Sequence, residues 1–589
     1  MSEAAPAGYD VVVAGSGAGG MTAAAVCAAE GLRVLVVEKS ALIGGTLAIS
    51  GGMVWLPDNP KMAEAGIADS RAAAEAYLRA VVPGEKNAAA RKAFLDRGSE
   101  ALAFLEAKTA LRFRPVLRYP DYYPDEPGAT LGGRVLEPVP FDGAELGPDF
   151  ALLRPPLPEF TLFGGMMVDR ADIPHLRRAG RSVGSTLRSL RLIARYGRER
   201  LRAPRGTSLV LGNALAARLL WSLRDLGVEL MRSARLTELL VEDGRVAGVI
   251  VQQAGVRREI RAARGVVLAT GGFSHDPEAR ARRLPPGAGR HSAVVAENTG
   301  DGIRAGLAIG GSAPPQPGGD AFWVPVSLFR RADGTEAVHP HTVTDRAKPG
   351  SIVVDQTGRR FVNECVSYHE FVRAMLRAAR PASPSYMICD AAFLWKYGLG
   401  AIKPFTPRIP RHLRDYLVCA NSIEELAGRL GVPPRNLEVT VDAFNEAARR
   451  GEDPEFGRGR DAYQRHLGDV DQRPNPCVAP IAKPPFYAIA LYPGDLGTAA
   501  GLSTDENARV LDAAGRPIPH LYACGNDMAS VMNGAYPGPG ITLGPALTFG
   551  YIAARHLASA TLAGASRKDN VQPGAGAPAA ADPGGETNV

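Results

Sequence analysis

The glycine-rich turn at residues 15–20 constrains the fold of this chain more than any other feature. The apolar run 9–14 before it predicts a β-strand, and the alanine-rich run 20–30 after it predicts a helix. A second apolar run, 33–37, predicts another strand, which ends at Glu38. A strand, a tight turn, a helix and a second strand form a βαβ unit. The sequence therefore predicts an α/β fold with a Rossmann-like domain.

Three of the four glycines in this turn have distinct physical roles. Gly15 permits the tight turn, Gly17 lets the backbone approach a pyrophosphate, and Gly20 allows the helix to pack closely on the strand. The helix N-terminus offers free N–H groups to phosphates. Glu38 is placed to bind the ribose hydroxyls of an adenosine, which suits FAD or NAD and disfavours NADP. The turn therefore predicts a dinucleotide site.

A second glycine cluster, Gly44 to Gly52, favours FAD over NAD. A flavin stays bound and is enclosed along its whole length, so more backbone has to approach it. The later runs 269–272 and 298–302 fit the same need. The predicted FAD-binding residues are Gly15, Gly17, Ala18, Gly19, Gly20, Glu38, Lys39, Gly45, Thr46, Ser50, Gly51, Gly52, Thr270, Gly271, Gly272, Gly300, Asp301, Gly525, Asn526 and Leu543.

The remaining pattern predicts a discontinuous FAD-binding domain. Strands at 236–240, 246–251 and 265–270 belong with the first unit, and a strand at 520–523 with a final helix from about Gly544 completes it. Between these parts lie proline-rich loops, a strand at 351–355 and helices at 422–430 and 436–449. We predict a first FAD-binding part at 1–272, an inserted α+β substrate domain at 273–490, a return segment at 491–565 and a disordered tail at 566–589.

An arginine-rich insertion at about 150–205 stands apart from this pattern. Residues 175–205 hold ten arginines, interleaved at helical spacing with Leu187, Leu190 and Ile193. Such a helix can lie on an acidic membrane surface, which would suit a lipid-like substrate. A solvated helix packed on its own domain explains the pattern equally and is the simpler expectation.

Charge and cysteine usage exclude several functions. The net charge of +7 is small for 589 residues, and no nucleic-acid motif accompanies it. The six cysteines lack C-x-x-C spacing, so reduced thiols in a cytoplasmic protein are expected, without disulfides or a zinc site. Four histidines, His291, His339, His341 and His369, are candidates for binding a substrate carboxylate. The pair His339 and His341 is the best of these, but we expect a loop pair and no metal site.

The motifs, in this order, resemble the flavoprotein superfamily of fumarate reductases, succinate dehydrogenases and 3-ketosteroid dehydrogenases. The resemblance runs from residue 9 to about 560 and leaves out the arginine-rich stretch and the tail. Fumarate reductases place an arginine shortly after a stretch like 358–364, where this chain has Tyr368, and another before a C-terminal Gly-Gly turn, where it has Tyr536. Tyrosines in place of the two arginines indicate a neutral carbonyl substrate.

This pattern is similar to that of the 3-ketosteroid Δ1-dehydrogenases. Their Tyr-x-Gly-x-Gly motif matches 536–540, and their Pro-Asp-Tyr motif matches 120–122, although Tyr119 and Tyr123 flank it. The resemblance implies that the Tyr536 hydroxyl and the Gly540 N–H bind the ketone oxygen, that Tyr368 removes the α-proton, and that Tyr122 assists it. A tyrosine has an ordinary pKa of about 10, and we expect the neighbouring phenol and the enclosed site to favour its ionised form.

The leading hypothesis is a dehydrogenase that desaturates the 1,2 bond of a small apolar, steroid-like 3-ketone. It passes the hydride to flavin N5 and the electrons on to an external acceptor. Desaturation at the Δ4(5α) bond, or of an oxocyclohexane carboxylate, remains an alternative. The latter would need a basic residue at the far end of the substrate. A fumarate or ene reductase is a further alternative, but the chain has no heme or iron–sulfur cysteine motif. A non-catalytic flavin-binding module that contacts a membrane or a partner is the last.

Overall fold

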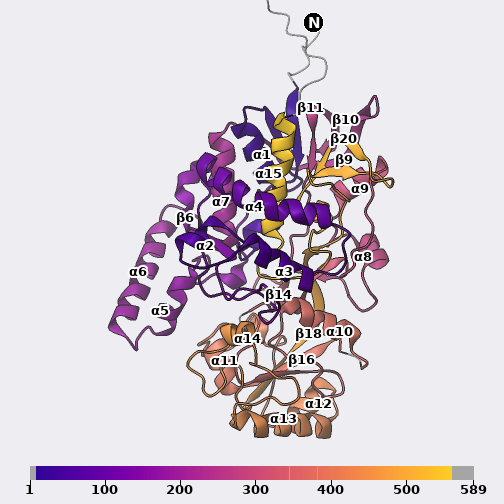
Figure 1. Cartoon of the computed structure of the whole chain (residues 1–589). Helices are drawn as coiled ribbons and strands as arrows, with labels where there is room; N and C mark the ends of the chain where they lie inside the picture. The colour runs from indigo at the N-terminus through magenta and orange to yellow at the C-terminus, as the bar shows by residue number, and fades with distance from the viewer. Residues whose placement is uncertain (1–7, 344, 381, 560–589) are drawn as a thin grey trace, which may run out of the picture.

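The computed structural model describes residues 8–343, 345–380 and 382–559, so the predicted tail at 566–589 lies outside the described residues. Figure 1 shows two bodies of β-structure joined by long strands and loops. The first has an eight-stranded sheet and the second a seven-stranded sheet. No helix of the described ranges is long and apolar enough to cross a membrane.

The first sheet contains the predicted βαβ unit. Strand β1 pairs in parallel with both β2 and β11, and all four residues of β2 are buried, as expected for strands covered on both faces. Helix α1 (Ala18–Ala29) begins two residues before the predicted start. The strands of this sheet are β1 (Tyr9–Ala14), β2 (Val34–Val37), β8 (Glu229–Met231), β9 (Ala234–Glu242), β10 (Arg245–Gln253), β11 (Val256–Leu268), β19 (Arg509–Leu511) and β20 (Pro517–Ala523).

The end of the chain returns to this sheet. Strand β20 pairs in parallel with β11, and helix α15 (Leu543–Ser559) packs against α1, where it is drawn in yellow in Figure 1. Glycines make that contact close, since a Cβ at Gly550 would lie 2.6 Å from the Gly19 carbonyl oxygen. The carboxyl ends of β1, β11 and β20 therefore meet at one edge of the sheet, which is where dinucleotides bind in such folds.

The second sheet is mostly antiparallel, in the order β14-β13-β18-β16-β15, with β12 and β17 also paired to β18. Its strands are β12 (His291–Ser292), β13 (Ala321–Arg330), β14 (Glu336–Pro340), β15 (Ser351–Val354), β16 (Ser385–Asp390), β17 (Val418–Ala420) and β18 (Phe486–Thr498). The predicted boundary at residue 490 falls inside β18, every partner of which belongs to this sheet. We therefore propose that the second domain extends to about residue 498.

The remaining elements cover these sheets and connect them. The longer helices are α3 (Arg71–Val81), α4 (Ala88–Lys108), α6 (Val183–Arg200), α7 (Leu211–Asp225), α9 (Asp301–Ala308), α10 (Tyr368–Arg377), α12 (Ile423–Leu430) and α13 (Pro434–Arg449). The shorter ones are α2 (Pro60–Glu64), α5 (Ile173–Arg177), α8 (Pro277–Arg283), α11 (Ala391–Tyr397) and α14 (Ala462–Leu467). Two small sheets pair β3 (Val54–Trp55) with β5 (Val135–Pro138) and β4 (Phe113–Pro115), and β6 (Phe141–Asp142) with β7 (Ser208–Leu209).

The arginine-rich stretch forms an arm that projects from the side of the molecule as α5 and α6 (Figure 1). The predicted helix is therefore divided in two. Its inward face is made of Ser185, Ser189, Leu192 and Tyr196. Its apolar stripe points the other way, because Leu187 and Leu190 are 50% and 57% exposed. The helix is therefore solvated and packed on its own domain, as the simpler expectation had it, but through its inward face and not through the leucine stripe.

Candidate active site

One cavity of about 450 Å³ extends from the glycine turn after β1 to the predicted tyrosines. The predicted residues that line it are Gly15, Gly17, Ala18, Gly19, Glu38, Lys39, Gly45, Thr46, Ser50, Gly51, Gly52, Thr270, Gly271, Asp301, Gly525, Asn526, Leu543, Tyr122, Tyr368, Tyr536 and Gly540. The structure therefore brings together residues that lie more than 500 positions apart in the chain. Gly20, Gly272 and Gly300 do not line it.

These three glycines lie outside the cavity lining and fix the conformation of the segments that form it. A Cβ at Gly20 would lie 2.0 Å from the Gly15 carbonyl oxygen, so Gly20 serves the close packing that the sequence indicated. Gly300 has a φ of +76° and its N–H donates to the carbonyl of Gly272. The N–H of Gly272 in turn donates to Asp527. The two later glycines thus fix loop conformations next to the cavity.

The dinucleotide cradle, which is the glycine turn after β1 with the backbone at Gly51 and Gly525, fits the dinucleotide end of FAD. A Cβ at Gly17 would meet no atom within 4 Å, and the same is true of Gly51 and Gly525, so all three backbones face open space. Gly15 has a φ of +110°, and a Cβ there would lie 2.2 Å from the Ala269 carbonyl oxygen. A side chain is therefore excluded at Gly15 by the turn, whereas at Gly17 it would enter the volume that a pyrophosphate needs.

Glu38 is held where a ribose would lie. It is buried, and one carboxylate oxygen accepts hydrogen bonds from the N–H and hydroxyl of Ser16 at 2.9 and 2.6 Å. The other accepts from the N–H of Ser40 at 2.7 Å. These donors orient the carboxylate at the wall of the cavity, with lone pairs left for hydroxyl donors.

A buried carboxylate, Asp527, joins two of the cofactor loops, and sequence reasoning did not single it out. Asp527 accepts hydrogen bonds from the hydroxyl of Thr270 and from the N–H groups of Thr270 and Gly272. Asp301, which was predicted, is tied instead to Lys39 at 2.9 Å and to Arg235 at 2.8 Å. The signal for Asp527 was its position directly after the predicted Gly525 and Asn526.

Three tyrosines meet at the other end of the cavity. The hydroxyl of Tyr122 donates to that of Tyr368 at 3.0 Å, and the ring of Tyr536 stacks on that of Tyr122 with centroids 5.6 Å apart. The Tyr368 and Tyr536 rings are 5.1 Å apart, edge to face. Tyr368 is the first residue of α10, where the partial positive charge of the helix favours an anion.

The neighbours of Tyr122 have other partners. The Tyr123 hydroxyl donates to Glu370 at 3.0 Å, and Tyr123 does not line the cavity. Tyr119 lines the cavity with its ring against His466, 4.6 Å between centroids. Of the three adjacent tyrosines, Tyr122 is the one whose hydroxyl contacts Tyr368.

The backbone around Tyr122 is anchored by a buried ion pair that the sequence motif did not explain. Asp121 binds Arg134 at 2.8 Å and accepts a hydrogen bond from the indole of Trp55, also at 2.8 Å. The Tyr122 N–H donates to the carbonyl of Pro537 at 2.9 Å. The Pro-Asp-Tyr motif and the Tyr-x-Gly-x-Gly motif are thereby fastened to each other.

Gly540 turns the chain into α15 close to the tyrosines. It has a φ of +98°, and a Cβ there would lie 2.5 Å from the Met53 carbonyl oxygen, so a side chain is excluded. Its carbonyl accepts from the N–H of Trp55, while its own N–H donates no hydrogen bond within the described part of the chain. A free N–H beside a helix N-terminus is suited to bind an oxyanion.

The pKa values of the tyrosines differ from the expectation. Burial raises the pKa of Tyr368 well above 10, and the proximity of Tyr536 raises it further. The hydrogen bond from Tyr122 lowers the pKa but offsets only part of this increase. Burial likewise raises the pKa of Tyr536 to about 12. The predicted help from Tyr122 has the right direction, but the enclosed site opposes ionisation because a buried charge loses its hydration.

The arginine-rich insertion also contributes to the cavity, although the sequence had set it apart. Leu157, Phe160 and Met167 line it, and Arg154 lines it while paired with Glu297 at 2.9 Å. Apolar residues in a loop carry no motif that would have revealed this role.

The chain is similar to a protein family and to several proteins of known type. Residues 10–543 match the family described as FAD binding domain. The 4-oxocyclohex-2-ene-1-carboxylate 5-dehydrogenase of Sinomonas cyclohexanicum is 39% identical over 97% of this chain and 96% of that protein. The 3-oxosteroid 1-dehydrogenase of Mycobacterium tuberculosis is 38% identical over 93% of this chain and 98% of that protein.

Among solved structures, the 3-ketosteroid Δ1-dehydrogenase of Sterolibacterium denitrificans, in complex with 1,4-androstadiene-3,17-dione, is similar throughout. It is 39% identical with a TM-score of 0.87, covering 93% of this chain and 99% of that one. The open space at Gly17 and the orientation of Glu38 agree with the cofactor that this family binds. The chain belongs to the FAD-binding flavoprotein family that includes the 3-oxosteroid 1-dehydrogenases, and it is an FAD-dependent oxidoreductase.

Proposed function

We propose that this enzyme introduces a double bond next to the ketone of a 3-ketosteroid, at the 1,2 position. The observation that carries the proposal is the cluster of Tyr122, Tyr368 and Tyr536 in the cavity that also contains the dinucleotide cradle. A neutral ketone needs hydrogen-bond donors and a base, and phenols supply both without attracting a carboxylate. Two relatives with 39% and 38% identity are named for dehydrogenation of ketones.

In the proposed mechanism, the hydroxyl of Tyr536 and the N–H of Gly540 bind the ketone oxygen. Both donors stabilise the negative charge that develops on this oxygen when the α-proton leaves. Ionised Tyr368 takes that proton, and the hydrogen bond from Tyr122 stabilises the phenolate before transfer. FAD, when bound, supplies the acceptor for the hydride from the β-carbon. Electrons then leave the enzyme to an external acceptor.

The lining of the cavity favours a steroid over an oxocyclohexane carboxylate, the substrate named for a relative with 36% identity. Met53, Leu157, Phe160 and Val343 give it an apolar wall. Among the described lining residues the cations are Lys39 and Arg154, and both are paired with carboxylates. A substrate carboxylate would therefore lose hydration without gaining an unpaired cation, which is costly.

A comparison of the two substrates tests this choice. We expect kcat/KM to be greater for androst-4-ene-3,17-dione than for 4-oxocyclohexanecarboxylate by at least about 100-fold, since the steroid buries far more apolar surface. Steady-state rates with an artificial electron acceptor measure both values. A greater kcat/KM for the carboxylate would assign the enzyme to the oxocyclohexane dehydrogenases instead.

We further propose that this cytoplasmic enzyme contacts acidic membranes through the outer face of α6. Val183, Leu187, Leu190 and Leu201 recur on that face and are at least half exposed. Arginines flank this stripe, and Arg191, Arg198 and Arg202 have no acidic partner among the described residues. An apolar stripe beside cations suits the interface of an acidic bilayer. Tyr196 of α6 donates to the carbonyl of Phe163, three residues after Phe160, which lines the cavity, so the arm contacts the segment that forms the cavity wall.

Vesicle binding tests the membrane contact. The double variant Leu187→Asp/Leu190→Asp should lower binding to phosphatidylglycerol vesicles by at least about 100-fold, since two exposed leucines no longer enter the bilayer. Val439→Asp, on the exposed face of α13, is the matched control and should bind like wild type. Co-sedimentation measures both. Unchanged binding of the double variant, or no binding of wild type, would exclude this contact.

A further inference from the structure

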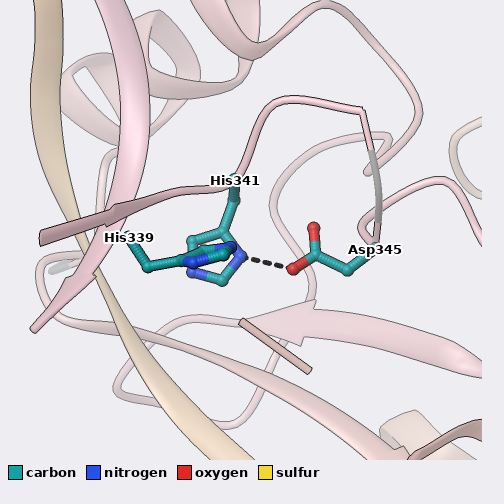
Figure 2. A group of neighbouring side chains, drawn as sticks. All are labelled: His339, His341 and Asp345. Atoms are coloured by element: carbon teal, nitrogen blue, oxygen red, sulfur yellow. Dashed lines mark hydrogen bonds and ion pairs between the residues drawn. The ribbon is translucent and has the colours of Figure 1, made fainter. Parts of the chain in front are cut away.

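A buried cluster of His339, His341 and Asp345 lies behind the wall of the cavity. His339 lies in β14 and His341 directly follows the last residue of this strand, and the centroids of the two rings are 5.0 Å apart. Asp345 comes from the loop that follows, and its carboxylate is 2.7 Å from Nδ1 of His341 (Figure 2). One ligand atom from each residue lies within 4.8 Å of the others.

His339 is the unusual member of this cluster. It is 5% exposed, and neither ring nitrogen has a hydrogen-bond partner within the described ranges. Buried polar nitrogens are normally paired, because leaving them unpaired costs free energy. A neutral imidazole carries one lone pair on its ring nitrogens, which can bind a metal ion. Figure 2 shows this ring beside that of His341.

The surroundings of His341 resemble the outer shell of a metal site. Its Nε2 lies 2.7 Å from the hydroxyl of Ser327, which leaves Nδ1 directed toward Asp345. Histidines that bind metals usually donate their second N–H to an oxygen in this way, which fixes the ring. The N–H of Arg346 donates to Oδ1 of Asp345 at 2.8 Å, so Oδ2 is the oxygen that faces the histidines.

We propose that His339, His341 and Asp345 bind one divalent metal ion of the zinc class. Two neutral imidazoles and a carboxylate are ligands that Zn²⁺ accepts, with a water as the fourth. Zinc bonds of about 2.0 to 2.2 Å place neighbouring ligand atoms roughly 3.4 Å apart. The 2.7 Å contact between His341 and Asp345 therefore has to lengthen, and His339 has to approach them from a separation of at most 4.8 Å. The sequence had predicted a loop pair and no metal, because spacing alone could not place Asp345 beside the histidines.

The site would stabilise the cavity wall. Pro340 lies between the two histidines, and Thr342 and Val343 follow them, and all three line the cavity. A metal that joins β14 to Asp345 would hold this segment in place. The proposal concerns only these side chains and does not depend on which ketone the enzyme oxidises.

Zinc titration of the flavin-loaded enzyme tests the site. After treatment with EDTA and desalting, wild type should bind one Zn²⁺ per chain in competition with a chromophoric chelator. His339→Phe should weaken this binding by more than about 100-fold, because a lost ligand costs more than a lost outer-shell partner. The phenyl ring keeps the stack on Phe160, so the fold should be retained. Zinc should raise the Tm of wild type but not that of His339→Phe.

Two further variants keep the test decisive. His291→Gln removes a half-buried histidine outside the cluster and should bind zinc like wild type. Asp345→Asn has nearly the same shape as the native residue and should weaken binding even if His339→Phe folds poorly. Failure of wild type to bind zinc would overturn the proposal, and so would wild-type affinity in both cluster variants. Ketone oxidation can be present or absent in either case, so the two proposals fail separately.

Discussion

Tyr536→Phe should lower the single-turnover rate on androst-4-ene-3,17-dione by about 10² to 10³-fold, which is the usual effect of removing one oxyanion donor. The phenyl ring would still pack between Tyr122 and Tyr368, so the fold and the bound flavin should be retained. The hydroxyl alone would be lost. Stopped-flow absorbance of the flavin under anaerobic conditions measures the rate.

Tyr123→Phe is the matched control for this variant. It lies beside Tyr122, but its hydroxyl contacts Glu370 and it does not line the cavity. Its rate should stay close to that of wild type. Equal rates for Tyr536→Phe and wild type would mean that another group polarises the ketone.

Tyr368→Phe should lower the same rate by about 10² to 10⁴-fold, the range expected when a general base is lost. The partner variant Tyr122→Phe should have a smaller effect, because it removes the hydrogen bond at 3.0 Å but leaves the base. A larger effect at Tyr122 than at Tyr368 would exchange their roles.

The raised pKa of Tyr368 also predicts the direction of the pH dependence. The base must be ionised, and burial places its pKa well above 10, so only a small fraction is ionised near neutral pH. That fraction rises about tenfold per pH unit below the pKa. The single-turnover rate of wild type should therefore increase with pH from 7 to 9. A rate that is constant or falls over this range would exclude Tyr368 as a base that must ionise from a raised pKa.

The first half of the cofactor site could be predicted because its signals are local. Gly15, Gly17 and Glu38 lie within one βαβ unit, where the backbone demands of a tight turn and a ribose contact are visible as residue types. The hairpin of β9 and β10 could be predicted for the same reason, since its turn residues separate two apolar runs. Such features depend on neighbours in sequence, and the structure has them with small shifts in their ends.

Long-range features escaped the sequence. Asp527 accepts a hydrogen bond from the loop that follows β11. Leu157 lines the cavity, although it belongs to an insertion that the sequence pattern separated from the FAD-binding domain. The exposure of Leu187 depends on which face of α6 meets the protein, and periodicity gives the stripe but not its partner. The sign of the pKa shift at Tyr368 depends on burial among distant residues, which a motif does not show.

The central claim is that this site removes hydrogen from a 3-ketosteroid, and one anaerobic experiment tests it most directly. The flavin-loaded enzyme is mixed with androst-4-ene-3,17-dione, the oxidised-flavin absorbance is followed, and the steroid is then analysed by mass and NMR spectroscopy. The account predicts loss of that absorbance and a product two hydrogens lighter with a new 1,2 double bond. If a saturated 3-ketosteroid, mixed with the enzyme in a parallel sample, gained a 4,5 double bond while androst-4-ene-3,17-dione stayed unchanged, the enzyme would be assigned the Δ4(5α) reaction. Unchanged absorbance and unchanged steroid with androst-4-ene-3,17-dione would contradict the account.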